Sequence, residues 1–154
     1  LDLGEKFGVN ICLADALGVR NPVLSELGEC MFTGELESET DIHDFAKLAK
    51  KNLDCKGLRY TDIKDRVKKV AVSSGAGGSN VFDAALAGVD VLVTGEIKHH
   101  EIIAANSLGI DIIDAGHFKS EDIVILPLVN KLSKEFFEII FTKSQSCDDM
   151  IKFI

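Results

Sequence analysis

Short apolar segments alternate with amphipathic stretches along the second half of the chain. Four of these segments predict strands, at residues 67–73, 89–93, 110–114 and 136–141. The stretches between them predict helices at about residues 80–87, 96–107 and 119–133. This β-α-β-α-β-α-β order over residues 67–141 predicts an α/β fold, with helices packed on a mainly parallel sheet.

The first part of the chain carries shorter signals. A helix is predicted over residues 8–17 and would end at Gly18, while Asn21-Pro22 predicts a turn and residues 31–36 a strand. Thr40 is expected to cap a helix whose apolar positions recur at helical spacing, namely Ile42, Phe45, Ala46, Ala49 and Leu53. We therefore divide the chain into residues 1–63, the remnant of an amino-terminal or intermediate region, and residues 64–154, an α/β domain.

Three predicted loops should share one edge of the sheet. In parallel β-α units every strand-to-helix loop lies at the carboxyl ends of the strands, where ligands bind. The loops concerned are residues 73–80, 94–96 and 115–120. Because they hold most of the chemically active side chains, we expect a functional site there.

His117 and Glu121 are the first candidates in these loops. Glu121 follows His117 by four positions, so a helix beginning near His117 places both side chains on one face. An imidazole nitrogen and a carboxylate can converge on a divalent cation such as zinc, manganese, iron or magnesium. A capping histidine and an ordinary first-turn glutamate would give the same spacing, so both interpretations stay open.

A glycine-rich segment, SSGAGGSN at residues 73–80, joins a predicted strand to a helix. Its backbone N–H groups could cradle an anion, or the glycines could form a tight turn that lets the helix pack close to the sheet. The segment lacks the Gly-Lys-Ser/Thr of a P-loop, and Asn80 replaces the third glycine of the dinucleotide fingerprint. Neither interpretation is favoured by the sequence.

The segment TGEIKHHE at residues 94–101 adds further candidates. Its spacing predicts that His100 leans toward the packed face as a core histidine and that His99 faces solvent. Glu96, at the helix start on the rim, is the candidate catalytic group. Asp114, at the end of the third strand, could orient His117.

The amino-acid composition excludes some classes of binding partner. A formal charge of −8 without a basic cluster argues against nucleic acid and against an anionic membrane surface. The four cysteines are widely spaced, as expected for isolated thiols in a reducing compartment. No secretory signal or membrane-spanning segment is visible, so we expect a cytoplasmic location. The opening Leu-Asp-Leu reads like the start of a piece of a larger protein.

Three segments together resemble the Nif-three-like family (NGG-interacting factor three), also called GTP cyclohydrolase I type 2 homologues. They are VAVSSGAGGS at residues 70–79, TGEIK at residues 94–98 with His100, and IIDAGH at residues 112–117 with Glu121. Their order and distances make the resemblance specific, and weaker agreement extends over essentially the whole chain.

The resemblance implies a toroidal homohexamer with a two-metal centre. Its metal ligands correspond to His117, Glu121 and Asp2, with Glu121 bridging the two metals. The family pattern also has an upstream His-His pair, which precedes the first residue of this chain. The chain therefore carries part of the centre, and we expect weak metal binding.

The function implied is that of a metal-dependent hydrolase acting on a purine nucleotide such as GTP, with a metal-activated water as nucleophile. The substrate-binding candidates are Gly75, Gly77, Ser79, Thr94 and His100. The alternative is a non-catalytic metal-binding scaffold or regulatory interaction protein. A third hypothesis, a simple nucleotide binder using the glycine turn, predicts ligand binding that survives chelation of metal.

Overall fold

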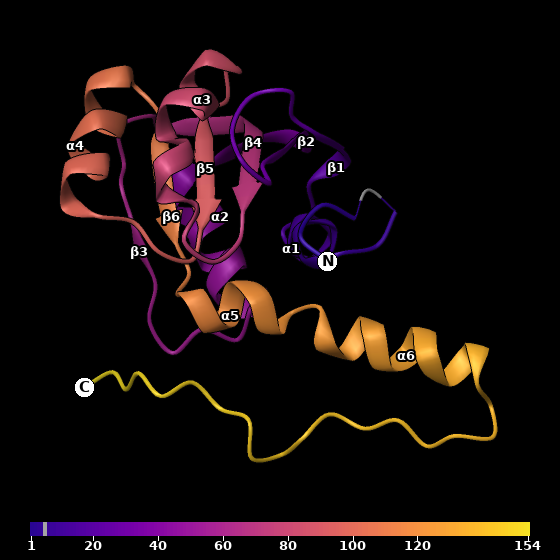
Figure 1. Cartoon of the computed structure of the whole chain (residues 1–154). Coiled ribbons are helices and arrows are strands. Elements are labelled where there is room, and N and C mark those ends of the chain that lie inside the picture. The colour runs from indigo at the N-terminus through magenta and orange to yellow at the C-terminus, as the bar shows by residue number, and fades with distance from the viewer. Residues whose placement is uncertain (5) are drawn as a thin grey trace.

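A six-stranded sheet forms the centre of the computed structural model, which describes residues 1–4 and 6–154. The strands are β1 (Arg20–Leu24), β2 (Phe32–Asp41), β3 (Arg59–Tyr60), β4 (Arg66–Ser73), β5 (Val91–Thr94) and β6 (Asp111–Asp114). The helices are α1 (Val9–Ala16), α2 (Ile42–Asn52), α3 (Val81–Leu86), α4 (His99–Leu108), α5 (His117–Asp122) and α6 (Ile125–Glu135), and a short 3₁₀ helix, η1 (Gly77–Asn80), precedes α3. Helices cover both faces of the sheet, so the α/β class is confirmed (Figure 1).

The strand order is β1-β2-β4-β5-β6-β3. Among the strands that the structure describes, β4, β5 and β6 pair in parallel, whereas β1, β2 and β3 join the sheet antiparallel. Three of the four strands predicted for the second half of the chain are thus confirmed, but the sheet is mixed rather than mainly parallel. Strands from residues 1–63 and from residues 64–154 lie in this one sheet, and the proposed division into two regions stays a prediction.

Alternate side chains of the central strands enter two separate cores. Val70 and Val72 of β4 pack with α1 and α2, while Ala71 between them packs with α3 and α4. On β5, Leu92 points to the α3–α4 side and its neighbours to the other. Because both faces are buried, these strands read as continuous apolar runs rather than as an alternating pattern.

The predicted fourth strand at residues 136–141 is wrong. These residues follow α6, form no strand, and expose Phe137 and Ile140 by 85% and 91%. The place beside β6 is taken by β3, with Arg59 opposite Asp114 and Tyr60 opposite Ile113. No edge of β6 is left for another strand.

The single helix predicted over residues 119–133 is two helices, α5 and α6, that meet at Ile123 and Val124. Pro127 explains the break, because it has no N–H to donate to the carbonyl of Ile123 and its ring crowds that carbonyl. In the first turn of α6 the same proline is well tolerated. α6 then extends away from the sheet (Figure 1).

Two local predictions in the first half also need correction. Asn21 and Pro22 lie inside β1, at a register shift of this edge strand, where proline is tolerated because no ladder hydrogen bond is needed. The cap of α2 is Asp41 and not Thr40, since the Asp41 carboxylate accepts hydrogen bonds from the N–H groups of His43 and Asp44. The helix itself and its buried apolar face are as predicted.

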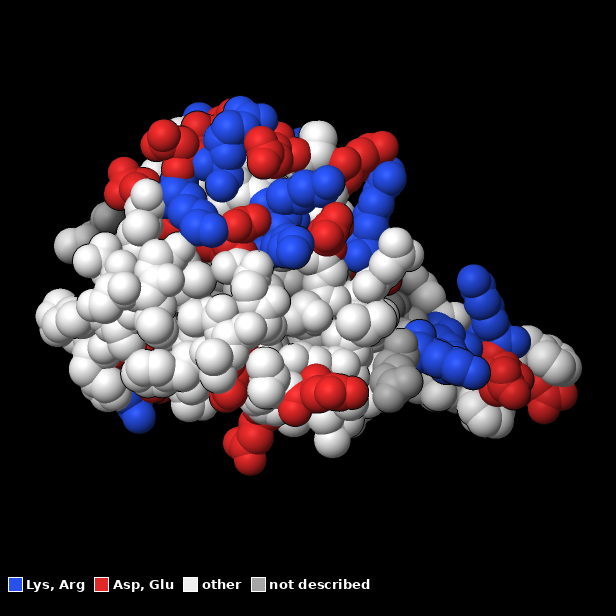
Figure 2. Space-filling model, turned by 90° about the horizontal axis from the view of Figure 1, so that it is seen from above, with Lys and Arg blue, Asp and Glu red and all other residues white. Residues whose placement is uncertain are grey.

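Charge is unevenly distributed over the surface. Seen from above, Lys, Arg, Asp and Glu side chains crowd the part of the surface that lies at the back of Figure 1, while the front is largely free of them (Figure 2). That front is the side of α3 and α4 (Figure 1). The exposed residues of these two helices include Phe82, Leu86 and Ile103, at 60%, 76% and 54%. None of the helices described is long and apolar enough to cross a bilayer.

Candidate metal centre

The three loops at the carboxyl ends of the parallel strands do converge, as predicted. The Gly75 carbonyl in the loop after β4 accepts hydrogen bonds from the Gly95 N–H and from the Thr94 hydroxyl, at 3.0 and 3.3 Å. The Gly75 N–H donates to Ser120 Oγ of α5 at 3.0 Å. One residue therefore ties the loop after β4 to the loop after β5 and to the helix after β6.

His117 lies between two carboxylates on this rim. Helix α5 begins at His117, so Glu121 is one turn further along the same helix, and its Oε1 lies 3.3 Å from His117 Nε2. On the other side of the ring, Glu96 Oε2 lies 3.2 Å from His117 Nδ1. The three side chains are about half exposed, so a solvated ion or substrate can reach them.

The sequence suggested Asp114 as the residue that orients His117. The structure shows Glu96 in contact with the imidazole instead. Asp114 instead pairs with Arg59, its cross-strand neighbour on β3, and accepts a hydrogen bond from the Gly116 N–H at 3.1 Å. Its side chain is 8% exposed. Asp114 thus shapes the loop that leads into α5 without contacting the imidazole.

The glycine-rich loop packs as a tight turn. A β-carbon added at Gly77 would lie 2.5 Å from Ser73 Oγ and 2.8 Å from Thr94 Oγ1, so only glycine fits there. The Ser74 N–H donates to Asn10 and the Gly78 N–H to the Glu96 carbonyl. With these N–H groups engaged inside the fold, the geometry favours the packing interpretation over an anion cradle.

Two buried asparagines that the sequence did not single out for function hold the rim together. Asn10 Oδ1 accepts from the Ser74 N–H, while its Nδ2 donates to the carbonyls of Cys30 and Asp2. Asn80 Oδ1 accepts from the Glu29 N–H, and its Nδ2 donates to the Glu29 carbonyl and to Ser73 Oγ. An amide among the apolar residues of α1 was the one available signal for Asn10.

The remaining site candidates differ in how exposed they are to solvent. Thr94 is fully buried with Gly75 and Gly77, whereas Ser79 lies on the surface. His100 is exposed on α4, so its interpretation as a core histidine is wrong. Asp2 lines a cavity of about 480 Å³ together with Glu121.

The donor atoms present make up only part of a metal site. Within residues 1–4 and 6–154, no three His, Cys, Asp or Glu side chains converge in a geometry that could hold a metal ion. His117 Nε2 and the Glu121 carboxylate nevertheless face one another across 3.3 Å, with Glu96 fixing the other ring nitrogen. A carboxylate on the far nitrogen is the arrangement that metal-binding histidines prefer. The pair fits a divalent cation as two ligands, not as a closed site.

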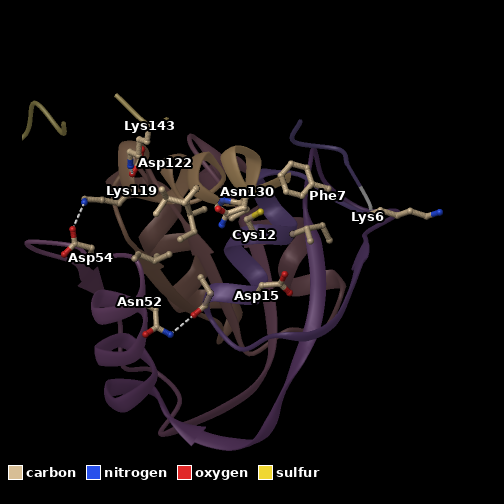
Figure 3. Close-up of a pocket in the computed structure, with 16 residues that line it drawn as sticks. Lys6, Phe7, Cys12, Asp15, Asn52, Asp54, Lys119, Asp122, Asn130 and Lys143 are labelled. Atoms are coloured by element: carbon tan, nitrogen blue, oxygen red, sulfur yellow. Dashed lines mark hydrogen bonds and ion pairs between the residues drawn. The ribbon is translucent and has the colours of Figure 1, made fainter. Parts of the chain in front are cut away.

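A larger cavity, of about 740 Å³, lies on another side of α5 (Figure 3). Lys119 and Asp122 of α5 contribute to its wall, and both are already neutralised, by Asp54 and Lys143 respectively. No histidine lines it. We therefore place the candidate chemistry at His117, despite the larger volume of this cavity.

Cys55 lies behind the rim and has no role in the proposed chemistry. Its thiol donates to the Ala115 carbonyl at 3.3 Å, and burial raises the pKa of the thiol to about 11. The nucleophilic thiolate form is therefore scarce near neutral pH. All four cysteines are free thiols, as expected from their spacing.

Comparison with known proteins gives consistent matches. The model of a family described as Duf34/NIF3 (NGG1p interacting factor 3) matches residues 1–147. A Clostridium perfringens protein named GTP cyclohydrolase 1 type 2 homolog is 31% identical over 97% of this chain and 60% of its own length. The chain thus spans less than two thirds of that relative.

Solved structures show the same fold. The Bacillus cereus protein related to NIF3 is 31% identical, with a TM-score of 0.74 over 80% of this chain and 36% of the other. The Staphylococcus aureus protein SA1388 aligns over 100% of this chain and 67% of its own, with a TM-score of 0.84. At 21% identity, the latter likeness concerns the fold alone.

Proposed function

Because the chain belongs to the Duf34/NIF3 family, we propose that it binds a divalent metal ion through His117 Nε2 and the carboxylate of Glu121. The observation that carries this proposal is the imidazole held between the carboxylates of Glu96 and Glu121. Two carboxylates on opposite sides of one ring are best stabilised by positive charge between them, and a divalent cation on the Nε2 side supplies it.

In this proposal each residue has a separate task. Glu96 accepts a hydrogen bond from Nδ1–H of His117, which fixes the tautomer and leaves the Nε2 lone pair directed at the cation. Glu121 supplies negative charge and one or two oxygen ligands. Asp2 lines the cavity that also contains Glu121 and is the third candidate ligand. When bound, the cation would polarise a substrate oxygen and activate water for attack.

We further propose hydrolysis of a purine nucleotide, in keeping with the name GTP cyclohydrolase 1 type 2 homolog of the relatives. The second candidate function is a metal-binding scaffold without catalysis, favoured by the absence of a third converging ligand among the residues described. Incubation with GTP and manganese, followed by chromatography of the products, separates the two: turnover that chelation abolishes supports hydrolysis, and its absence supports the scaffold.

Titration calorimetry with manganese tests the metal site. We expect weak binding of one ion per chain, because even the loss of an outer partner costs about 10–100-fold in affinity, and the loss of a ligand removes a bond as well. His117→Ala and Glu121→Ala should each abolish it. Manganese is preferred to zinc as the probe because it binds thiolates poorly, so the four cysteines do not interfere.

The matched control is His99→Ala, which removes an exposed histidine from α4 without touching the rim. This variant should bind manganese like the parent. If the His117→Ala protein binds as well as the parent, the assignment of the metal site is wrong.

We also propose that the chain self-associates, as the family resemblance implies, through the side of α3 and α4, where charged side chains are few (Figure 2). Phe82 and Leu86 of α3 are exposed, large apolar side chains that a second copy would cover. Leu86→Glu should lower the molar mass measured by light scattering to that of a monomer. Leu48→Glu, on the opposite helical layer, should leave the mass unchanged, and a monomeric parent at high concentration would refute the proposal.

A further inference from the structure

We infer that Arg59 forms an oxyanion-binding subsite beside the proposed metal pair, where it would hold the phosphate group of a small organic substrate. Arg59 lies on β3, the two-residue edge strand opposite β6. The inference rests on the proposed function for the position of the reacting group. Its own evidence is the guanidinium and the cavity around it.

The guanidinium is fixed before any ligand arrives. Arg59 Nε lies 3.1 Å from Asp114 Oδ2, Nη2 bonds to the same oxygen, and Nη2 also lies 3.5 Å from the Ile97 carbonyl. Asp114 is nearly buried, so it cannot follow the arginine into solvent. One carboxylate oxygen of Asp114 therefore holds one side of the guanidinium. Because the arginine is already ordered, binding of a ligand does not include the entropy cost of ordering this side chain.

The other side of the guanidinium is available. The Arg59 side chain is 68% exposed, and within residues 1–4 and 6–154 its Nη1 has no hydrogen-bond partner. Nη1 carries two N–H groups, and an oxygen of a phosphate or carboxylate can accept a charge-assisted hydrogen bond from them. Arg59 also lines a cavity.

That cavity connects Arg59 to the proposed metal pair. It has a volume of about 320 Å³ and is lined by Arg59, Glu96 and His117, with an apolar wall of Leu58, Ile151 and Phe153. Arg59 is the one Lys or Arg in this lining. A small organic phosphate could set its oxygens on Arg59 and its apolar body against the wall, with the rest of the molecule directed to His117.

Local charge makes the subsite dependent on a cation. Glu96, Asp114 and Glu121 carry negative charge near a single arginine, so an anion approaching the metal-free protein meets net repulsion. A divalent ion at His117 and Glu121 would offset that repulsion. We therefore expect oxyanion binding to strengthen when manganese is added.

The test uses phenyl phosphate as the probe and phenol as its uncharged counterpart, observed by ligand-detected NMR with and without magnesium. Magnesium replaces manganese here because it does not broaden the signals. Arg59→Gln should weaken phenyl phosphate binding roughly tenfold to hundredfold, the loss expected for a charge-assisted hydrogen bond. Phenol binding should not change. Arg59→Lys should recover only part of the affinity, since an ammonium cannot pair with Asp114 in the planar geometry that orients the guanidinium.

The control is Arg20→Gln, on the opposite edge strand of the sheet, where the arginine also pairs with a carboxylate, that of Glu37. It should bind phenyl phosphate like the parent. Circular dichroism and manganese calorimetry on Arg59→Gln check that β3 and the metal pair are intact.

The outcomes separate the two proposals. If Arg59→Gln binds phenyl phosphate as the parent does, or if the parent binds none under either condition, the subsite is refuted and Arg59 only pins β3. If the parent binds phenyl phosphate but no metal, and the Arg59→Gln variant loses phenyl phosphate binding, the subsite stands and the metal site fails. Loss of phosphate binding with metal affinity retained supports both.

Discussion

Asn10→Ala should lower the free energy of unfolding by about 3 kcal/mol, because unsatisfied buried polar groups cost about 1–3 kcal/mol each. The alanine would leave the Ser74 N–H and the Cys30 carbonyl without their partners, in a position where Asn10 is 1% exposed. In urea titrations the midpoint should fall by about 1.5 M, given slopes of roughly 2 kcal/mol per molar for a chain of this size.

Two further variants make this expectation specific. Asn10→Asp keeps an acceptor for the Ser74 N–H but removes both donated hydrogen bonds, so it should also be destabilised. Asn106→Ala removes an exposed asparagine from α4 and should change the midpoint little or raise it, because alanine is the better helix former. An Asn10→Ala midpoint equal to that of Asn106→Ala would show that Asn10 does not hold the rim.

The parts of the fold that the sequence predicts correctly are those with local causes. Each central strand is apolar on both faces, and each crossover helix is short, so β4, β5 and β6 stand out as separate runs. The error at residues 136–141 has a non-local cause. That segment has a strand-like composition, but its place beside β6 is occupied by β3, a strand of only two residues with no apolar pattern.

The same distinction applies to the candidate site. The relation between His117 and Glu121 follows from four-residue spacing on one helix, and α5 does begin at His117. The pairing of His117 with Glu96 spans 21 residues, and that of Asn10 with Ser74 spans 64. Such contacts depend on how the loops converge in the folded chain. For that reason the sequence identified Glu96 as a rim residue but could not show that it contacts His117. It suggested Asp114 for that contact instead.

Glu96→Gln should lower manganese affinity about 10–100-fold while leaving one ion per chain, the loss typical when the partner of a ligating histidine is removed. Glutamine can still accept a hydrogen bond from Nδ1–H, but without a negative charge it makes His117 a weaker donor to the metal. Glu96→Ala, which removes the acceptor as well, should bind more weakly still. Calorimetry on the parent and both variants gives the comparison.

The control for Glu96 is Glu135→Gln, at the exposed end of α6, which should bind manganese like the parent. The result decides between two roles for Glu96. A group that only transfers protons to a substrate would leave metal affinity unchanged in Glu96→Gln, because no substrate is present in the titration. A group that orients His117 must change it, since the Nδ1 contact at 3.2 Å exists before any substrate binds. Unchanged affinity in Glu96→Gln, together with loss in His117→Ala, would therefore return Glu96 to the position of a catalytic candidate and leave the orientation of His117 to α5 alone.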